Sequence, residues 1–438
     1  MVHSFKNNGN YYLYDVESGN LFNVDKACFD IFNGEECDYS PKEVNEIKAE
    51  IKELTEKGLL NAINENDFLS EKSFNIKSVC LHISHDCNLR CKYCFADEGA
   101  YHGKRENMPL NVAYKAIDFL IENSSDMKNL EVDFFGGEPL MNFEVLKKTV
   151  TYATQQAKKA GKNIKFTTTT NGILLNKEAS DYLNETMDNV VLSLDGRKEV
   201  HDEARPTVNG KGSYDIILDK FKYFKSIRRD KSYFVRGTFT HLNKDFCNDV
   251  LAMADNFDQV SVEPVVLPDS HKMALKNDDL PVLFEQYEKL AKEYVNRRKN
   301  KDTWFSFFHY NVDLLNGPCL KKRVMGCGAG CTYIAVTPDG KIYPCHQFAG
   351  EKEYCLGSVF DGILNRSLRQ KFNQSNMFTK EECTNCWARY HCSGGCSANA
   401  LHFNNDIDKP YALACQLIKK RLECALYVYD REVNLPQN

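Results

Sequence analysis

Three cysteines stand close together in the segment Cys87-Asn-Leu-Arg-Cys91-Lys-Tyr-Cys94. A single loop with this spacing can bring three thiolates to one metal centre. A closed structural zinc site takes four ligands, so a residue such as His85 would have to complete it. Three thiolates on a 4Fe–4S cluster would instead leave one iron open for a substrate or cofactor. The spacing by itself does not identify the metal.

Cysteine is concentrated a second time near the C-terminus, where residues 319–396 hold nine of the 18 cysteines in the chain. A closely spaced run reads Cys383-x2-Cys386-x5-Cys392-x3-Cys396. The cysteines that accompany this run are Cys319, Cys327, Cys331, Cys345 and Cys415. In a reducing cytosol, clustered cysteines more often bind metal or do redox chemistry than form disulfides. A zinc ribbon is the alternative to an iron–sulfur site here.

Three polar motifs fall where predicted strands end: Gly136-Gly137-Glu138-Pro139, Thr169-Thr170-Asn171-Gly172 and Ser193-Leu194-Asp195-Gly196. Paired glycines let a ligand approach the backbone closely, and Glu138 could accept a hydrogen bond from an ammonium group. Arg205 lies shortly after the third motif and could pair with a carboxylate. Arg236 and Glu263 are further candidates for a cleft, although a structural salt bridge explains these two equally well.

Strands that alternate with helices must position these motifs. The predicted strands are short and rich in β-branched or aromatic residues: Val79–Ile83, Leu130–Phe135, Ile164–Thr169, Val190–Leu194, Tyr233–Phe239 and Val260–Val266. Helical stretches such as Leu110–Ile121 and Phe143–Lys159 lie between them. Six such units predict an α/β fold in which a parallel sheet curves into a partial (β/α)6, TIM-like barrel. Active sites of barrels lie at the carboxyl ends of the strands, where the motifs fall.

Residues 1–75 are predicted to form a separate module. The segments YYLYDV and NLFNV are typical of two short strands, and a helix is expected near Ala27–Phe32. A second helix begins at Ser40, with Pro41 at its first position and Glu43 completing a capping box. This order indicates a small winged-helix-like domain. A barrel domain over residues 78–310 and a cysteine-rich tail over residues 311–438 follow it.

The composition narrows the class of protein. The net charge of −5 excludes the strongly basic balance of a general nucleic-acid binder. No apolar run reaches the roughly 18 residues that a membrane helix needs, and the N-terminus shows no basic-then-apolar signal peptide. We therefore expect a cytoplasmic protein with no membrane or nucleic-acid partner. A hydrophobic fraction of 42% is enough for several buried cores.

The three-cysteine loop, with the aromatic Tyr93 just before its third cysteine, resembles the cluster motif of the radical S-adenosylmethionine (SAM) enzymes. The resemblance implies that Cys87, Cys91 and Cys94 bind three irons of a 4Fe–4S cluster, while SAM chelates the fourth. One electron then cleaves SAM to methionine and a 5′-deoxyadenosyl radical. Tyr93 is expected beside the adenine. The remaining SAM contacts implied are Gly136, Gly137 and Glu138 at the amino group, Ser193 near the ribose or carboxylate, Arg205 at the carboxylate and Glu263 in the cleft.

The cysteine-rich tail resembles the SPASM extension of radical SAM peptide-modifying enzymes, which carries two auxiliary 4Fe–4S clusters. The resemblance implies three clusters in all. Auxiliary cluster II would be held by Cys383, Cys386, Cys392 and Cys415. Auxiliary cluster I would be held by Cys327, Cys345 and Cys396. Its fourth iron would be bound by Cys319, the natural fourth ligand, or by the less favoured Cys331, or would be left without a protein ligand. The cysteines expected to be ordinary buried thiols are Cys28, Cys37, Cys80, Cys247, Cys355 and Cys424.

Over nearly its full length the chain is similar to maturases that install thioethers in SCIFF peptides, and to ranthipeptide and sactipeptide synthases. The resemblance implies a Cys-rich precursor peptide whose leader binds the N-terminal module, and a flavodoxin or ferredoxin as electron donor. We expect Cys319 to decide the catalytic role of auxiliary cluster I: as a ligand it closes the cluster for electron transfer, and if it is not a ligand the open iron can take the substrate cysteine. The alternative enzyme is an anaerobic sulfatase-maturating enzyme, which oxidises one Cys or Ser and forms no crosslink. The non-enzymatic alternative is a zinc-bound interaction protein.

Overall fold

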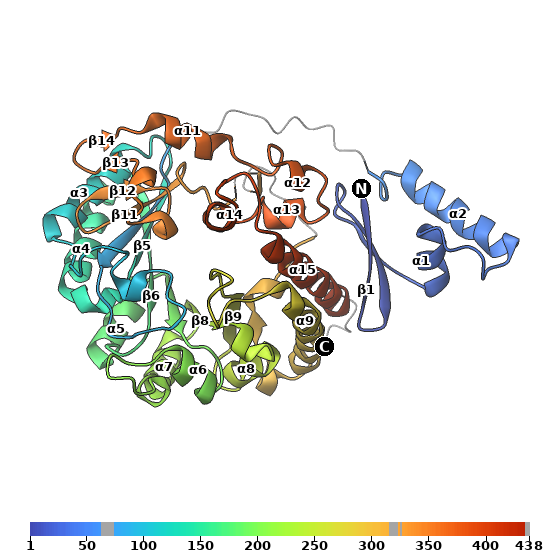
Figure 1. Cartoon of the computed structure of the whole chain (residues 1–438), viewed down its shortest axis with the longest axis horizontal. Helices are drawn as coiled ribbons and strands as arrows, with labels where there is room; N and C mark the ends of the chain where they lie inside the picture. Colours follow the sequence, from blue (N-terminus) through green and yellow to red (C-terminus); the bar gives the residue numbers. More distant parts are fainter. Residues whose placement is uncertain (63–73, 315–322, 325, 434–438) are drawn as a thin grey trace.

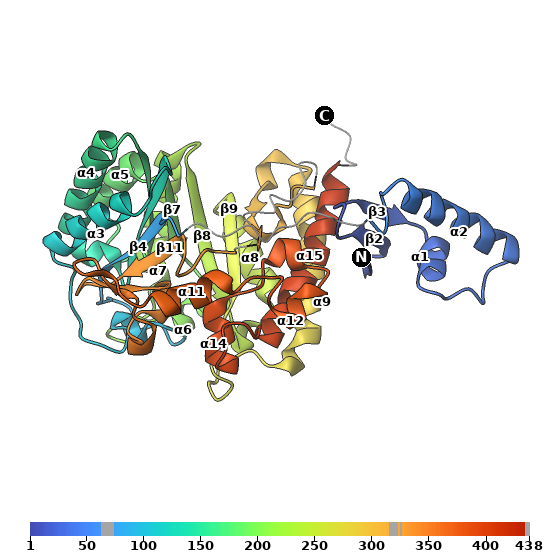
Figure 2. The same cartoon turned by 90° about the horizontal axis from the view of Figure 1, so that it is seen from above.

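The structure is a computed structural model of the chain, and it describes residues 1–62, 74–314, 323–324 and 326–433. An N-terminal module is followed by a curved sheet with helices on its outside and then by a tail that returns between the two (Figures 1 and 2). The fold is of the α/β class, with a large and mostly parallel sheet, as the sequence predicts.

The N-terminal module contains one strand more than the sequence predicted. Its elements are β1 (Val2–Asn7), β2 (Asn10–Asp15), β3 (Leu21–Val24), α1 (Lys26–Phe32) and α2 (Pro41–Glu56). The strands form an antiparallel sheet in the order β1-β2-β3. The capping box of α2 is confirmed, because the Ser40 hydroxyl accepts from the Glu43 N–H and the Glu43 carboxylate accepts from the Ser40 N–H. Residues 63–73, at the end of the predicted N-terminal module, lie outside the described residues.

The barrel contains the six predicted parallel strands in sequence order. Its strands are β4 (Ser78–Ser84), β5 (Asn129–Gly136), β6 (Asn163–Thr170), β7 (Asn189–Ser193), β8 (Ser232–Phe239), β9 (Gln259–Pro264) and the short β10 (Ser306–Phe307). Its helices are α3 (Leu110–Glu122), α4 (Phe143–Lys159), α5 (Lys177–Thr186), α6 (Lys198–Ala204), α7 (Tyr214–Arg228), α8 (Phe246–Ala254) and α9 (Leu280–Arg298). The sheet stays open, so one side of the barrel is left for other elements to cover (Figure 1).

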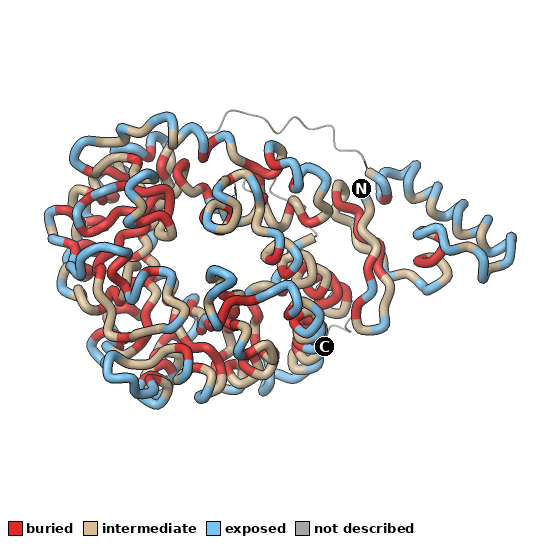
Figure 3. The backbone as a smooth tube through the Cα atoms, viewed as in Figure 1, coloured by how far each residue is buried: buried red, intermediate tan, exposed pale blue. Residues whose placement is uncertain are grey.

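Alternation along the strands separates a hydrophobic layer from a polar interior. In β5 the side chains of Leu130, Val132 and Phe134 are fully buried under the helices. The alternate residues Asp133 and Phe135 line the cavity inside the barrel. The buried chain segments accordingly follow the strands in Figure 3. The barrel interior is therefore a chamber with polar walls and not a packed core.

The tail adds directly to the barrel sheet. Its elements are β11 (Tyr333–Val336), β12 (Lys341–Tyr343), β13 (Gly357–Ser358), β14 (Gly362–Ile363), α11 (Arg366–Gln374), α12 (Glu381–Thr384), α13 (Arg389–Cys392), α14 (Ser397–Asn404) and α15 (Ala412–Val433). Strand β11 pairs in parallel with β4, the strand that precedes the three-cysteine loop. The division into three domains stays a prediction, and the sheet continues across the predicted boundary at residue 311.

Helix α15 joins the three parts of the molecule. It packs against α9 of the barrel and against β1 and β3 of the N-terminal module. Tyr12 and Tyr14 of β2 are almost completely buried and belong to the same hydrophobic core as the barrel strands. The Tyr12 hydroxyl donates to Asp430 of α15 at 2.9 Å. The N-terminal sheet is thus packed firmly on the tail, whereas α2 projects from it (Figure 1). In the described part of the chain, no helix is long and apolar enough to span a bilayer.

Candidate active site

A cavity of about 500 Å³ lies inside the barrel and is walled by residues at the carboxyl ends of its strands. This volume is typical of sites that bind small molecules. The cavity brings together every predicted residue of the SAM site. These residues are Cys87, Cys91, Tyr93, Cys94, Gly136, Gly137, Glu138, Ser193, Arg205 and Glu263.

The three cysteines of the loop between β4 and α3 share one corner of this cavity. Burial, together with the proximity of Cys87 and Cys94, raises the pKa of Cys91 to about 12. Burial likewise raises the pKa of Cys87 to about 12, with Glu138 and Cys94 adding to the effect. Half-buried thiols that disfavour each other's ionisation are stabilised as thiolates when a metal holds them. The donor set therefore fits an iron–sulfur cluster.

The paired glycines serve a close approach of backbone to backbone. A Cβ on Gly137 would come within 2.2 Å of the Asp86 carbonyl oxygen, and one on Gly136 within 2.3 Å of the Ser84 carbonyl oxygen. The N–H of Gly137 donates to the Ser84 carbonyl at 2.8 Å. The sequence predicted that these glycines make room for a ligand. In the structure, the lack of a side chain at each glycine lets the end of β5 pack against the start of the cysteine loop.

Glu138 is a buried residue of the cavity wall and fixes the end of the next strand. Its carboxylate accepts from the N–H of Asn171 and the hydroxyl of Thr170, both at 2.8 Å, and from the N–H of Leu140 at 3.0 Å. Burial nevertheless raises its pKa to about 7. The Asn171 side chain in turn donates to Asn88 at 2.8 Å, within the cysteine loop. Glu138 therefore aligns β6 with the loop, and its expected contact with an ammonium group stays a prediction.

Arg205 already has a carboxylate partner within the chain. Its guanidinium donates to both oxygens of the buried Asp195, at 3.0 and 3.1 Å. The Tyr93 hydroxyl donates to the same carboxylate at 2.5 Å, and Arg205 lies over the Tyr93 ring at 5.4 Å. Asp195 also accepts from the Thr238 N–H at 2.9 Å. The sequence analysis noted Asp195 only as part of a strand-end motif, yet it connects the cysteine loop to β8.

Arg236 and Glu263 pair with each other, at 3.5 Å, which is the structural alternative that the sequence left open. Glu263 also lies 3.2 Å from His309 and 3.1 Å from Arg421 of α15. Burial alone would raise the pKa of Glu263, but His309, Arg421 and Arg236 outweigh it and hold the pKa well below its usual range. Glu263 is therefore an ionised link between the barrel and the tail at the cavity edge.

The tail cysteines gather in the two predicted sets. Burial raises the pKa of Cys383 to about 12, and Cys392, Cys415 and Cys386 lie near enough to raise it as well. In the other set, burial raises the pKa of Cys345, to which Cys327 and Cys396 contribute. Chain segments far apart in sequence are thus folded together around each set. The roles of these seven cysteines as cluster ligands stay predictions.

Cys319 lies outside the described residues. Its competitor Cys331 is almost fully buried, and its thiol donates to Asn373 at 3.8 Å. Of the cysteines expected to be ordinary buried thiols, Cys80, Cys247 and Cys424 are buried, but the prediction was wrong for Cys37, which is exposed. Cys28 and Cys355 are only half-buried. Cys37 is exposed because it follows α1 in the projecting part of the N-terminal module.

Within the described residues, no three His, Cys, Asp or Glu side chains stand close enough to share a single metal ion. A 4Fe–4S cluster takes each thiolate on a different iron, so its ligands need not converge on one point. His85, the proposed fourth ligand of a zinc site, instead lies 2.9 Å from His82 and stacks on Tyr101.

Two titratable residues of the cavity were missed by the sequence analysis. Asp133 accepts from the Thr167 hydroxyl at 2.8 Å, and burial raises its pKa to about 6. His346 directly follows Cys345, and burial lowers its pKa to about 4. An acidic residue at an inward position of a β-branched and aromatic strand was the available signal for Asp133. His346 could be found only from the folded chain, which brings the tail to the barrel.

Comparison with known families places these features in a known architecture. The radical SAM superfamily model matches residues 81–246, and the SPASM iron–sulfur cluster-binding domain model matches residues 327–387. The chain therefore contains a radical SAM domain and a C-terminal SPASM domain. These two domains imply 4Fe–4S clusters and SAM as cofactors.

Individual relatives are similar over most of the chain. The radical SAM cyclopropyl synthase TigE of Paramaledivibacter caminithermalis is 23% identical, over 89% of this chain and 87% of TigE. A cysteine-type anaerobic sulfatase-maturating enzyme of Clostridium novyi is 24% identical, over 72% of this chain and 86% of that enzyme. The crystal structure of Streptococcus suis SuiB bound to its precursor peptide SuiA has the same fold, with a TM-score of 0.57 and 18% identity over 95% of this chain and 98% of SuiB.

The raised pKa of Glu138 predicts how stability depends on pH. Its folded-state pKa of about 7 lies above the ordinary 4.5, so the folded protein binds more protons than the unfolded chain between pH 8 and pH 6. Stability should therefore rise as the pH falls through this window, by about 1 kcal/mol from this group. This change in the free energy of unfolding is measured by urea unfolding of the anaerobically purified protein at pH 8 and at pH 6. Glu138→Gln should lose this increment, whereas Glu144→Gln, at an exposed position of α4, should keep it; equal pH trends in all three proteins would contradict the assignment.

Proposed function

We propose that this protein is a radical SAM peptide maturase that forms thioether bonds between cysteine thiols and carbon atoms of a ribosomally made precursor peptide. The observation that carries the proposal is that residues adjoining a tail cysteine line the same cavity as the three cysteines of the loop. His346 and Gln347, which directly follow Cys345, line the same cavity as Cys87, Cys91 and Cys94. A substrate cysteine in this cavity would lie beside the loop cysteines and near the chain segment that carries Cys345.

Thioether formation from a C–H and an S–H group removes one hydrogen atom, one proton and one electron. A cluster held by the three-cysteine loop, together with SAM, would supply the carbon radical that takes the hydrogen atom from the substrate. Cys327, Cys345 and Cys396 would hold an auxiliary cluster, which supplies an electron acceptor and, if Cys319 is not a ligand, an open iron for the substrate thiolate. An open site at Cys319 is our preferred arrangement, since a crosslinking enzyme must hold a deprotonated cysteine near the reacting carbon.

The residues of the chain would bind and orient the reactants. The buried group of Tyr93, Asp195 and Arg205 presents an aromatic face and a fixed cation to the cavity, which suits an adenine ring and a carboxylate. Asp133, at the inner end of the cavity, has a pKa near 6 and could accept the thiol proton at neutral pH. A flavodoxin or ferredoxin as electron donor also stays part of the proposal.

The N-terminal module would bind the leader of the precursor. Among the described residues, β3 has a strand partner on one side only, so its other edge can accept an extended peptide. Helix α2 has no fully buried residue, and its apolar side chains Val44, Ile47, Ile51 and Leu54 are half-buried at helical spacing. SuiB, whose structure contains a bound precursor peptide, covers nearly the whole chain including this region.

Formylglycine formation is the second candidate, because the chain resembles a cysteine-type sulfatase-maturating enzyme. That reaction oxidises one residue and forms no crosslink. The similarity to that enzyme extends over 72% of this chain, against 89% for TigE. Thioether formation, the cyclopropyl synthesis named for TigE and formylglycine formation would share the radical step. They differ in the reaction of the substrate carbon that follows.

The mass of the product separates these activities. The purified enzyme is incubated with SAM, a reductant and a Cys-rich precursor peptide. Each thioether bridge should lower the peptide mass by two hydrogens and should remove one thiol that can be alkylated. High-resolution mass spectrometry after thiol alkylation measures both. Loss of sulfur from a cysteine would indicate formylglycine and would reject thioether formation, as would the same two-hydrogen loss with every thiol still alkylated.

The loop cysteines predict a specific loss of iron. The proposed three clusters give about twelve irons per chain. Changing Cys87, Cys91 and Cys94 together to Ala should remove about a third of the iron and abolish SAM cleavage, whereas Cys247→Ala, at a buried thiol of α8, should change neither. Iron and sulfide analysis and chromatography of 5′-deoxyadenosine provide the measurements. Continued deoxyadenosine formation by the triple variant would contradict the assignment of the loop.

Leader binding predicts an effect of the apolar stripe of α2. Ile47→Asp should weaken binding of a labelled leader peptide about tenfold, equivalent to about 1.4 kcal/mol, because it places a charge in the stripe. Ala49→Asp puts the same charge at an exposed position of the same helix and should leave affinity within about twofold. Fluorescence anisotropy measures both, with circular dichroism to verify the fold. Equal affinities for the two variants would contradict leader binding at this stripe.

A further inference from the structure

The N-terminal sheet holds the segment that carries two of the proposed ligands of auxiliary cluster II. Cys386 and Cys392 are separated by five residues, 387–391, which include most of the short helix α13. Four of these five residues contact β1, β2 or the turn after β2. This arrangement could not be read from the sequence, since the two segments are more than 370 residues apart.

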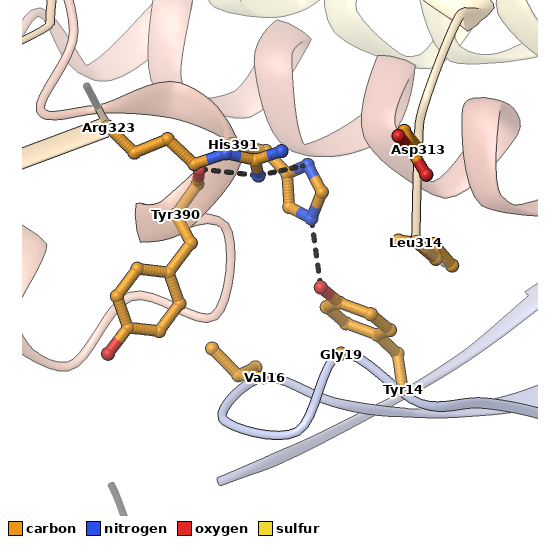
Figure 4. A pocket seen from close by; sticks show the side chains of 8 residues that line it. All are labelled: Tyr14, Val16, Gly19, Asp313, Leu314, Arg323, Tyr390 and His391. Atoms are coloured by element: carbon orange, nitrogen blue, oxygen red, sulfur yellow. Dashed lines mark hydrogen bonds between the residues drawn. The ribbon is translucent and has the colours of Figure 1, made fainter. Parts of the chain in front are cut away.

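One polar contact joins Tyr14 to His391, which directly precedes Cys392 (Figure 4). The Tyr14 hydroxyl lies 2.8 Å from His391 Nε2, and Arg323 lies 3.2 Å from His391 Nδ1. A guanidinium can only donate, so Nδ1 must accept and Nε2–H must donate to the Tyr14 oxygen. The tautomer and the ring orientation of His391 are therefore fixed from both sides, by Tyr14 of β2 and by Arg323 of the tail.

An ion pair holds the middle of the segment. Glu17, in the turn after β2, accepts from the Arg389 guanidinium and from the Tyr390 hydroxyl, the latter at 2.9 Å. The side chains of Glu17 and Arg389 are only 9% and 12% exposed, so water screens the pair weakly. Removing one partner would leave a buried charge without its counterion, which is costly.

Aromatic stacking fixes the start of the segment. The His3 ring of β1 lies parallel to Trp387 with their centroids 3.7 Å apart, and the Tyr14 ring meets Trp387 edge-on at 6.5 Å. Trp387 directly follows Cys386. Contacts from the N-terminal sheet thus bear on the residue next to each of the two cysteines.

We propose that the N-terminal sheet is part of the protein shell of auxiliary cluster II, and that Tyr14 and Glu17 are positioning residues for the ligand segment. The inference rests on the ligand assignment of the proposed function. Hydrogen bonds, nearby charges and solvent exposure around the thiolates set the reduction potential of an iron–sulfur cluster. The module that would bind the leader therefore also shapes the electronic properties of a cluster in the tail.

Two tyrosines on the same strand provide a matched test. Tyr14→Phe removes the hydrogen bond to His391 but keeps the ring, whereas Tyr12→Phe removes a similar hydrogen bond to Asp430, which is not part of the ligand segment. Redox titration of the reconstituted full-length protein, followed by electron paramagnetic resonance, measures each cluster. Tyr14→Phe should change the reduction equilibrium of one cluster about fivefold, and Tyr12→Phe by less than twofold.

A charge variant gives the expected sign. Glu17→Gln removes a buried negative charge near the segment, so electron uptake becomes easier and the potential of the same cluster should rise. The affected signal should be the one that disappears when Cys383 and Cys386 are both changed to Ala. Equal shifts in the two tyrosine variants, or no shift in Tyr14→Phe at full iron content, would overturn the inference. If the double cysteine variant instead keeps all of its iron and every signal, the ligand assignment of the proposed function fails.

Discussion

The whole structure depends on bringing cysteine thiols together in groups, some of them buried, without leaving charge unbalanced. A buried thiol resists ionisation, and a second thiol beside it makes ionisation harder still, as the raised pKa values of Cys91 and Cys383 illustrate. Such groups are stable as thiolates only around metal. The fold therefore has to bring the cysteines together from distant segments before any cofactor can stabilise them, and the sheet, α15 and the N-terminal module provide that framework.

Two carboxylates hold the residues around the cavity in fixed positions. Asp195 holds Tyr93 and Arg205 in place, and Glu138 holds the ends of β5 and β6 together through Asn171. Both carboxylates accept hydrogen bonds from protein groups. The residues that they bind therefore face the cavity in fixed orientations. This is the arrangement that a site handling a reactive radical requires, because misplaced groups would offer it alternative hydrogen atoms.

The sequence predicted well what depends on short-range spacing. The cysteine loop, the capping box at Ser40 and the six strands follow from local pattern and local chemistry. It did not predict the pairing of β11 with β4, the link from Glu263 to Arg421, or the contact of Tyr14 with His391. Each of these joins segments more than 150 residues apart, and their geometry depends on how whole elements pack. The exposure of Cys37 was missed for the same reason, since composition cannot tell which module surface remains uncovered.

The pairing of β11 with β4 also fixes the position of the tail relative to the cysteine loop. Ser78 to Leu81 and Tyr333 to Val336 are in register along one hydrogen-bonded ladder, so the tail cannot swing away from the barrel without breaking it. The cysteine loop follows one of these strands, and Cys345 follows the hairpin partner of the other. Electron tunnelling falls steeply with distance, so if both sites hold clusters, as we propose, the β-ladder keeps the tunnelling gap between them constant.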